Sequence, residues 1–172
     1  EELCKLIIEA AEHQAKVIVL PELCITGYTC QDLFYQDILL REAKESLLRI
    51  AHRTREIDGL IFVGLPLDYK GKLYNTAAVL HRGEILGIVP KKYLPNYHEF
   101  YEVRHFTKGM EEPVEIELAE GICVPMGTKL IFSCKDLPEL KVAAEICEDL
   151  WTPNPPSIGH ALAGATLVVN LS

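Results

Sequence analysis

The fold is decided by the stretch Ala144-Glu145-Ile146-Cys147-Glu148-Asp149-Leu150-Trp151. An apolar run, residues 140–144, leads into it, and a proline-rich loop, residues 152–156, follows it. The apolar run predicts a buried strand, and the prolines prevent it from continuing as strand or helix. Cys147 is therefore expected at the end of a strand, which is where open α/β sheets carry their chemistry.

Two further strands are expected to end in the same way. The apolar run 17–20 stops just before Glu22, and the run 85–89 stops just before Lys91. With Cys147, these residues supply a carboxylate, an ammonium and a thiol, which are suitable as a base, an electrophile and a nucleophile. The sequence thus predicts a catalytic site assembled from three strand ends.

The composition is that of one domain with a sizeable core. The chain has 172 residues, of which 49% are hydrophobic and 24% charged, a size and balance typical of a single domain. No apolar stretch approaches the roughly 20 residues of a membrane helix, so no membrane association is expected. The net charge of −8 argues against nucleic acid and anionic membranes as partners, because binding phosphates requires a basic surface.

The cysteines and the N-terminal residues favour a cytoplasmic protein. None of the six cysteines forms a Cys-x-x-Cys pair, which argues against a zinc site or a thioredoxin-like redox site. No secretory leader pattern is present. The cysteines are expected to be reduced.

Periodicity predicts an α/β chain with no internal domain boundary. Helices are expected over about 1–14, 37–57 and 157–165, and strands over 17–20, 60–65, 75–80, 85–89, 114–118, 128–134, 140–147 and 166–172. One helical turn is expected within 93–107, and Ser157 is expected to cap the third helix. A sheet-on-sheet sandwich with helices outside fits the antiparallel meander better than a doubly wound sheet does. We expect one domain, 1–172, that begins and ends mid-fold as a piece of a longer protein.

Three motifs resemble those of the nitrilase, or carbon–nitrogen hydrolase, superfamily. They are Pro21-Glu22, Pro90-Lys91-Lys92-Tyr93-Leu94 and Ile146-Cys147-Glu148-Asp149. Longer stretches, 22–34, 95–102 and 145–151, are similar to the glutaminase domain of the glutamine-dependent NAD synthetase family. The resemblance covers nearly the whole chain. It implies an α-β-β-α sandwich of nitrilase type, incomplete at both ends.

The resemblance also implies roles for individual residues. Cys147 would attack the side-chain amide of glutamine, with Glu22 as general base and acid. Lys91 would stabilise the oxyanion together with the backbone N–H of Glu148, and Glu102 matches a second, positioning glutamate. Tyr28, Tyr97, Phe100 and Glu148 match positions that shape the glutamine pocket.

The chemistry requires these residue types. A free thiol has a pKa of about 8.5 and is only a few per cent thiolate at neutral pH. A base and a nearby cation are therefore needed to activate Cys147, and Glu22 beside Lys91 can supply both. In the motif, one residue separates the lysine from the aromatic Tyr93, which selects Lys91 and leaves Lys92 for solvent.

Partners and cofactors follow from the same resemblance. The partners implied are glutamine, a C-terminal synthetase domain of the same protein, and further copies of the chain in a homo-oligomer. Neither a Gly-x-Gly-x-x-Gly motif, nor a P-loop, nor a Ser-Gly-Gly-x-Asp-Ser loop occurs in the sequence. No cofactor is therefore expected for this segment, and ATP and Mg²⁺ are expected for the synthetase domain.

Four alternatives remain at this point. His98, Glu102 and His105 have the spacing of one helix face and would then suit a metal ion. Cys147 and His160 could form a protease-like dyad. The chain could also be a stand-alone amidase of the same superfamily, or an inactive interaction module.

Overall fold

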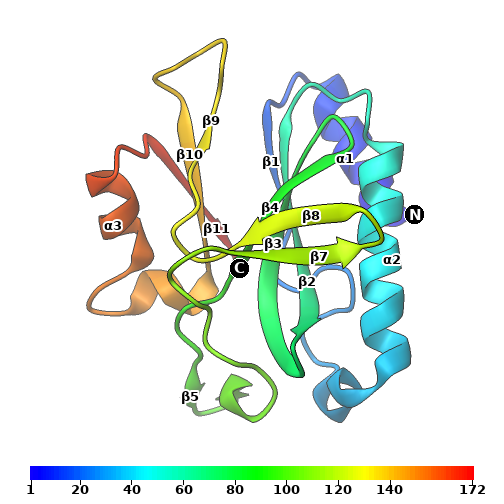
Figure 1. Cartoon of the computed structure of the whole chain (residues 1–172), viewed down its shortest axis with the longest axis vertical. Coiled ribbons are helices and arrows are strands. Elements are labelled where there is room, and N and C mark those ends of the chain that lie inside the picture. Colours follow the sequence, from blue (N-terminus) through cyan, green and yellow to red (C-terminus); the bar gives the residue numbers. More distant parts are fainter.

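The computed structural model describes residues 1–172 as an α-β-β-α sandwich (Figure 1). Two helices, α1 (Glu2–Glu12) and α2 (Asp37–Arg53), cover one face of a six-stranded sheet, and a three-stranded sheet lies on its other face. A short helix, α3 (Pro156–Leu162), packs on β10 (Lys141–Ile146) at the opposite outer side. The α/β class and the sandwich expected from the sequence are confirmed.

Both sheets are mixed. In spatial order the larger sheet contains β1 (Val17–Val19), β2 (Leu60–Tyr69), β3 (Lys72–His81), β4 (Glu84–Pro90), β8 (Ile122–Met126) and β7 (Val114–Ala119). The smaller sheet contains β11 (Leu167–Leu171), β10 and β9 (Phe132–Ser133). The pairs β1–β2, β4–β8 and β10–β11 are parallel, whereas β2, β3 and β4 form the predicted antiparallel meander. The remaining short elements are η1 (Gln31–Tyr35), β5 (Asn96–Tyr97), β6 (Phe100–Tyr101), η2 (Glu102–Arg104) and η3 (Cys147–Trp151).

The central strands are apolar on both faces because each face is covered. In β2, Ile61 and Val63 pack in the core beneath the helices, whereas Phe62 packs in the core between the two sheets. The helices contribute one apolar stripe each, with Ile7 of α1 and Leu47 of α2 fully buried. This arrangement explains why the sequence shows a continuous apolar run at 60–65 and helical periodicity at 37–53. None of the helices has the length and apolar character needed to cross a membrane.

Several predicted elements differ from those observed. The strand expected at 128–134 is wrong, because β8 at Ile122–Met126 forms a hairpin with β7 and only Phe132–Ser133 pairs further on. Pro125 lies within β8. Because a proline in a sequence argues against a strand, this strand was not predicted. Helix α2 ends at Arg53 and does not continue to residue 57 as expected. At its end, the hydroxyl of Thr54 donates to the carbonyl of Ile50.

The expected cap of the third helix is also wrong. Helix α3 begins at Pro156, a residue type favoured in the first turn because it lacks a backbone N–H. Ser157 lies inside that turn, and its backbone N–H donates to Oε2 of the buried Glu145 at 3.1 Å. The helix is therefore attached to the end of β10 by a side chain of that strand.

Gly64 supports the loop that follows β1. The carbonyl of Gly64 accepts a hydrogen bond from the backbone N–H of Ile25 at 3.2 Å, so this loop lies directly over β2. A Cβ at position 64 would lie 2.4 Å from the backbone nitrogen of Leu23 and 2.5 Å from the carbonyl oxygen of Pro21. Only glycine allows the backbone that carries Glu22 to approach the strand so closely.

We predict that Gly64→Ala lowers the free energy of unfolding by about 1–3 kcal/mol, because the added methyl group overpacks against backbone atoms that cannot rotate away. The control is Gly159→Ala in α3, where an added Cβ meets nothing within 4 Å, and which should be neutral or stabilising. Urea unfolding of the two variants provides the comparison. Equal stability of Gly64→Ala and the wild type would contradict this account.

Candidate active site

Three carboxyl- and ammonium-bearing side chains meet at one edge of the larger sheet. The ammonium of Lys91, directly after β4, donates to Oε1 of Glu22 at 2.7 Å and to Oε1 of Glu102 at 2.7 Å. The side chains of Lys91, Glu22 and Glu102 are only 0%, 6% and 4% exposed, respectively. Glu22 comes from the loop after β1 and Glu102 begins η2, so residues far apart in the sequence form one buried ionic cluster.

The cluster carries one more negative than positive charge. Burial alone lowers the pKa of Lys91, but Glu22 and Glu102 outweigh it and hold that pKa above its usual value. Burial raises the pKa of Glu102, and the repulsion from Glu22 adds to this, although Lys91 opposes it. Lys91 is therefore firmly protonated, and its charge favours the ionised form of Glu102.

The two glutamates differ in how many of their carboxylate oxygens accept hydrogen bonds. Both hydrogen bonds to Glu22 end on Oε1, from Lys91 and from Asn75, which leaves Oε2 without a protein donor. Glu102 uses both oxygens, because Oε1 accepts from Lys91 and Tyr28 and Oε2 accepts from Asn75. Glu22 has an atom available to take up a proton, whereas Glu102 is fully engaged in holding its neighbours.

Asn75 of β3 is a site residue that sequence reasoning missed. Its Nδ2 donates to Glu22 Oε1 at 2.6 Å and to Glu102 Oε2 at 3.4 Å, and its carbonyl accepts from the backbone N–H of Lys91 at 2.8 Å. The sequence does show a polar residue, Asn75, at the start of the apolar run 76–80. Because a buried amide needs a hydrogen-bond partner, this position indicated that such a partner exists. The sequence could not say which partner.

Cys147 lies at the turn from β10 into η3. Its φ of 42° is in the left-handed region, which for a residue with a side chain is strained and is common at functional sites. Its Sγ accepts a hydrogen bond from the hydroxyl of Ser172 at 3.4 Å. Burial raises the pKa of the thiol, Ser172 opposes the rise, Glu22 adds to it and Lys91 opposes it. The thiol is therefore neutral at rest and needs a base.

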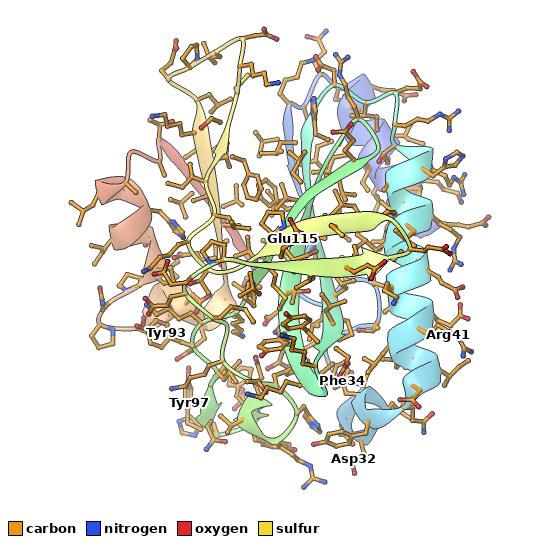
Figure 2. All side chains as sticks on the ribbon, viewed as in Figure 1. Asp32, Phe34, Arg41, Tyr93, Tyr97 and Glu115 are labelled. Atoms are coloured by element: carbon orange, nitrogen blue, oxygen red, sulfur yellow. The ribbon has the colours of Figure 1, made fainter.

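The four residues expected to shape a pocket form a connected row. The ring of Phe100 lies 6.3 Å from that of Tyr28 and 5.9 Å from that of Tyr97, both in edge-to-face geometry. The hydroxyl of Tyr97 donates to Glu148 Oε2 at 2.7 Å, which connects this row to the residue after Cys147. Figure 2 shows Tyr97 on the segment that follows β4, below Tyr93 and the η3 region. Tyr28 donates to Glu102, so the row begins at the ionic cluster.

The structure does not form the helix on which the alternative metal site depends. His98 lies in the turn of the β5–β6 hairpin with φ of 51°, so it shares no helix with Glu102 and His105. No group of three or more histidine, cysteine, aspartate or glutamate side chains is arranged to hold a metal ion.

The structure also bears on the alternative dyad and on the expected exposure of Lys92. His160 is buried in α3 and makes no hydrogen bond to Cys147, which removes the basis for a dyad. Lys92 is not fully solvated, because its ammonium pairs with Glu111 at 3.0 Å and only 23% of its side chain is exposed.

Residues 1–172 match the carbon–nitrogen hydrolase family over their whole length, and the chain belongs to that family of enzymes. It is 44% identical over 158 residues to a glutamine-dependent NAD(+) synthetase of Mycobacterium bovis, covering 92% of this chain and 23% of that protein. It is 41% identical over 172 residues to the corresponding synthetase of Aquifex aeolicus, covering 100% of this chain and 26% of that protein. The chain thus spans about a quarter of the length of these relatives.

Solved structures support the same fold. A glutamine-dependent NAD(+) synthetase from Cytophaga hutchinsonii has a TM-score of 0.85 and 32% identity, covering 99% of this chain and 27% of that one. An amidase from a Nesterenkonia species has a TM-score of 0.69 and 21% identity, covering 98% of this chain and 56% of that one. The second likeness concerns the fold alone.

We predict that Lys91→Met lowers the free energy of unfolding by about 3–5 kcal/mol at neutral pH, because two buried carboxylates lose their cation. Without the ammonium, which opposes the effect of burial on Glu102, the pKa of Glu102 rises further, and lowering the pH neutralises its buried charge. The loss of stability should therefore shrink as the pH is lowered.

The control is Lys129→Met. Lys129 forms an ion pair with Glu112 at 2.6 Å, but its side chain is 53% exposed, so little change is expected at any pH. Urea unfolding at neutral and at acidic pH measures both variants. A pH-independent effect of Lys91→Met would contradict the ionic description of the cluster.

Proposed function

We propose that this chain is a glutaminase domain in which Cys147, Glu22 and Lys91 hydrolyse the side-chain amide of glutamine. The observation that supports this most is the buried Lys91, which is held between two carboxylates and whose charge lowers the pKa of the thiol of the strained Cys147. The similarity to glutamine-dependent NAD(+) synthetases supports the choice of substrate. The domain spans residues 1–172 in this chain.

The first step is attack of the Cys147 sulfur on the amide carbon. The thiol proton passes to Oε2 of Glu22, the oxygen with no protein donor, as the S–C bond forms. Because proton transfer and S–C bond formation occur together, no free thiolate forms in a site whose burial raises the thiol pKa. General base catalysis by Glu22 replaces a lowered thiol pKa as the means of activation.

The negative charge then moves to the carbonyl oxygen of the substrate. Lys91 has three N–H donors, and two of them are used by Glu22 and Glu102. The third is available for the oxyanion, and the backbone N–H of Glu148 is proposed as the second donor. Because these donors are fixed before the reaction, they stabilise the transition state without reorganisation.

Collapse of the tetrahedral intermediate breaks the C–N bond. Glu22 returns its proton to the leaving nitrogen, so ammonia departs and a thioester remains on Cys147. A water molecule then attacks the thioester with Glu22 again acting as base, and glutamate leaves as the thiol is restored. Glu102 touches no reacting atom in this scheme and acts by positioning Lys91 and Tyr28.

The glutamine pocket is proposed to follow the aromatic row. Tyr28, Phe100 and Tyr97 present ring faces and edges that suit the methylene groups of glutamine. The carboxylate of Glu148, held by the Tyr97 hydroxyl at 2.7 Å, is placed at the far end of the row. A carboxylate there suits the α-ammonium group of the substrate.

We further propose that the ammonia serves a synthetase domain of the same protein, which amidates deamido-NAD to NAD with ATP and Mg²⁺. The relatives named glutamine-dependent NAD(+) synthetase are about four times the length of the matched region, since the chain covers 23% to 26% of them. Their names join a glutamine reaction to NAD synthesis. The present chain supplies the first of these activities in the proposal.

We predict that Glu22→Gln lowers the rate of glutamate release by about 10²–10⁴-fold, the usual contribution of a general base. Glutamine retains Oε1 for Lys91 and Asn75 and replaces only the free oxygen, so the protein should remain folded. The control is Glu117→Gln on the exposed side of β7, which should leave the rate unchanged. A near-normal rate for Glu22→Gln would remove Glu22 from the role of base.

The coupling is tested with the protein in its full natural length, by measuring glutamate release from glutamine with and without ATP plus deamido-NAD. Release should rise when both are present and should be abolished in Cys147→Ala, whereas Cys123→Ala, at an exposed cysteine of β8, should behave as the wild type. Release that is indifferent to both additions would instead indicate a stand-alone amidase. No release under any condition would favour the interaction module.

A further inference from the structure

Asp149 is a buried carboxylate that the proposed reaction does not use. Only 2% of the residue is exposed, yet no lysine or arginine side chain pairs with it. Its Oδ1 accepts from the backbone N–H groups of Lys92 at 3.1 Å and Tyr93 at 2.7 Å, and its Oδ2 accepts from the backbone N–H of Ile146 at 3.0 Å. Backbone donors from two separate segments therefore converge on one side chain.

These donors belong to the segments that carry the lysine and the nucleophile. Lys92 immediately follows Lys91, and Ile146 immediately precedes Cys147. No other side chain bridges these two segments by hydrogen bonds to the backbone of both. Figure 2 shows Tyr93 next to the η3 region, where the segment after β4 passes the end of β10.

We propose that Asp149 is a positioning residue whose ionised carboxylate fixes the Lys91 ammonium relative to the Cys147 thiol. The proposal rests on the proposed function, because it assigns Asp149 a part in the same reaction. An ionised carboxylate only accepts hydrogen bonds, so both of its oxygens match backbone donors. A protonated carboxyl has an O–H of its own, which would face one of these N–H groups and weaken the connection.

Backbone strain gives this connection a second role. Cys147 has a φ of 42°, and such a conformation persists only when its surroundings enforce it. The hydrogen bond from Ile146 to Asp149 closes the turn that contains Cys147 between them. The same carboxylate thus holds the strained turn and the lysine-bearing segment at once.

The protonation of Asp149 falls within an accessible pH range. Burial raises its pKa to about 6, and the N–H groups of Ile146, Tyr93 and Lys92, followed by the charge of Lys91, oppose the rise. Lys91, at the end of β4, donates to Glu22 and Glu102 and acts on Asp149 only through its charge. The Tyr93 hydroxyl donates to the carbonyl of Asn154 instead.

The direction of this shift sets how the stability of the fold depends on pH. Because the pKa is higher in the folded state than its ordinary value of 3.8, the folded protein binds a proton more tightly than the unfolded chain does. Stability associated with Asp149 therefore declines as the pH rises from 3.8 to about 6. The negative charge at neutral pH therefore has a net cost to the stability of the fold, although the backbone N–H groups of Ile146, Tyr93 and Lys92 favour it locally.

The test is Asp149→Asn in the protein at its full natural length. The amide keeps the size of the side chain but offers one acceptor oxygen, and its NH₂ group meets a backbone N–H. We expect kcat for glutamate release to fall about 10²-fold, as when reacting groups are displaced by about 1 Å, with KM nearly unchanged. In the wild type kcat should fall as the pH drops through about 6, and this acidic limb should be absent from the variant.

The matched control is Asp136→Asn, at an exposed aspartate outside the site, which should retain both kcat and the acidic limb. Asp149→Asn with wild-type kcat and an unchanged acidic limb would overturn the proposal. Activity that survives in Cys147→Ala would instead remove the proposed function, so the two failures are distinguishable.

A second measurement avoids any effect of substitution on folding. Hydrogen exchange of the wild type, corrected for intrinsic rates, is compared well above and well below the Asp149 pKa of about 6. The amides of residues 91–94 should lose protection at the lower pH relative to residues 76–80 of β3. Equal protection of both segments at the two pH values would overturn the proposal.

Discussion

The edge of the molecule that carries the candidate site is organised around the ion cluster of Lys91. Removing an ammonium and two carboxylates from water is costly, and their mutual attraction offsets that cost only when further hydrogen bonds satisfy the remaining oxygens. Asn75 and Tyr28 provide those bonds. The loop after β1, the end of β4 and the start of η2 must therefore meet at one point, and each is attached to a strand or hairpin that fixes its position.

The sandwich provides the rigidity that such a cluster requires. β2 and β3 are covered on both faces by two separate apolar cores, so the strand ends that surround the site have little freedom to move. Gly64 allows the Glu22 loop to lie against β2, and the second sheet brings β10 and Cys147 to the same edge. The packing of the core therefore also determines the geometry of the site.

The sequence predicted what depends on local pattern. Apolar runs located β1, β4 and β10, and the polar residues just after them identified Glu22 and Lys91 as neighbours, because strand ends gather at an edge. It did not identify Asn75, since a polar residue in a buried strand shows that a partner exists without showing which. It misplaced the strand at 128–134 because Pro125 lies in β8. His98 and His105 were grouped by helical spacing, whereas a hairpin forms there.

In the proposed mechanism, burial of Cys147, together with the excess negative charge of the cluster, explains why the thiol is protonated at rest. Loss of the Cys147 proton to solvent would place a second uncompensated negative charge in a largely buried site, and both burial and Glu22 raise the thiol pKa accordingly. Transfer of that proton to Glu22 keeps the net charge of the site constant. The developing charge then appears on the substrate oxygen, beside the unused N–H of Lys91. The site therefore disfavours the thiolate in the resting enzyme and favours the negative charge where the reaction produces it.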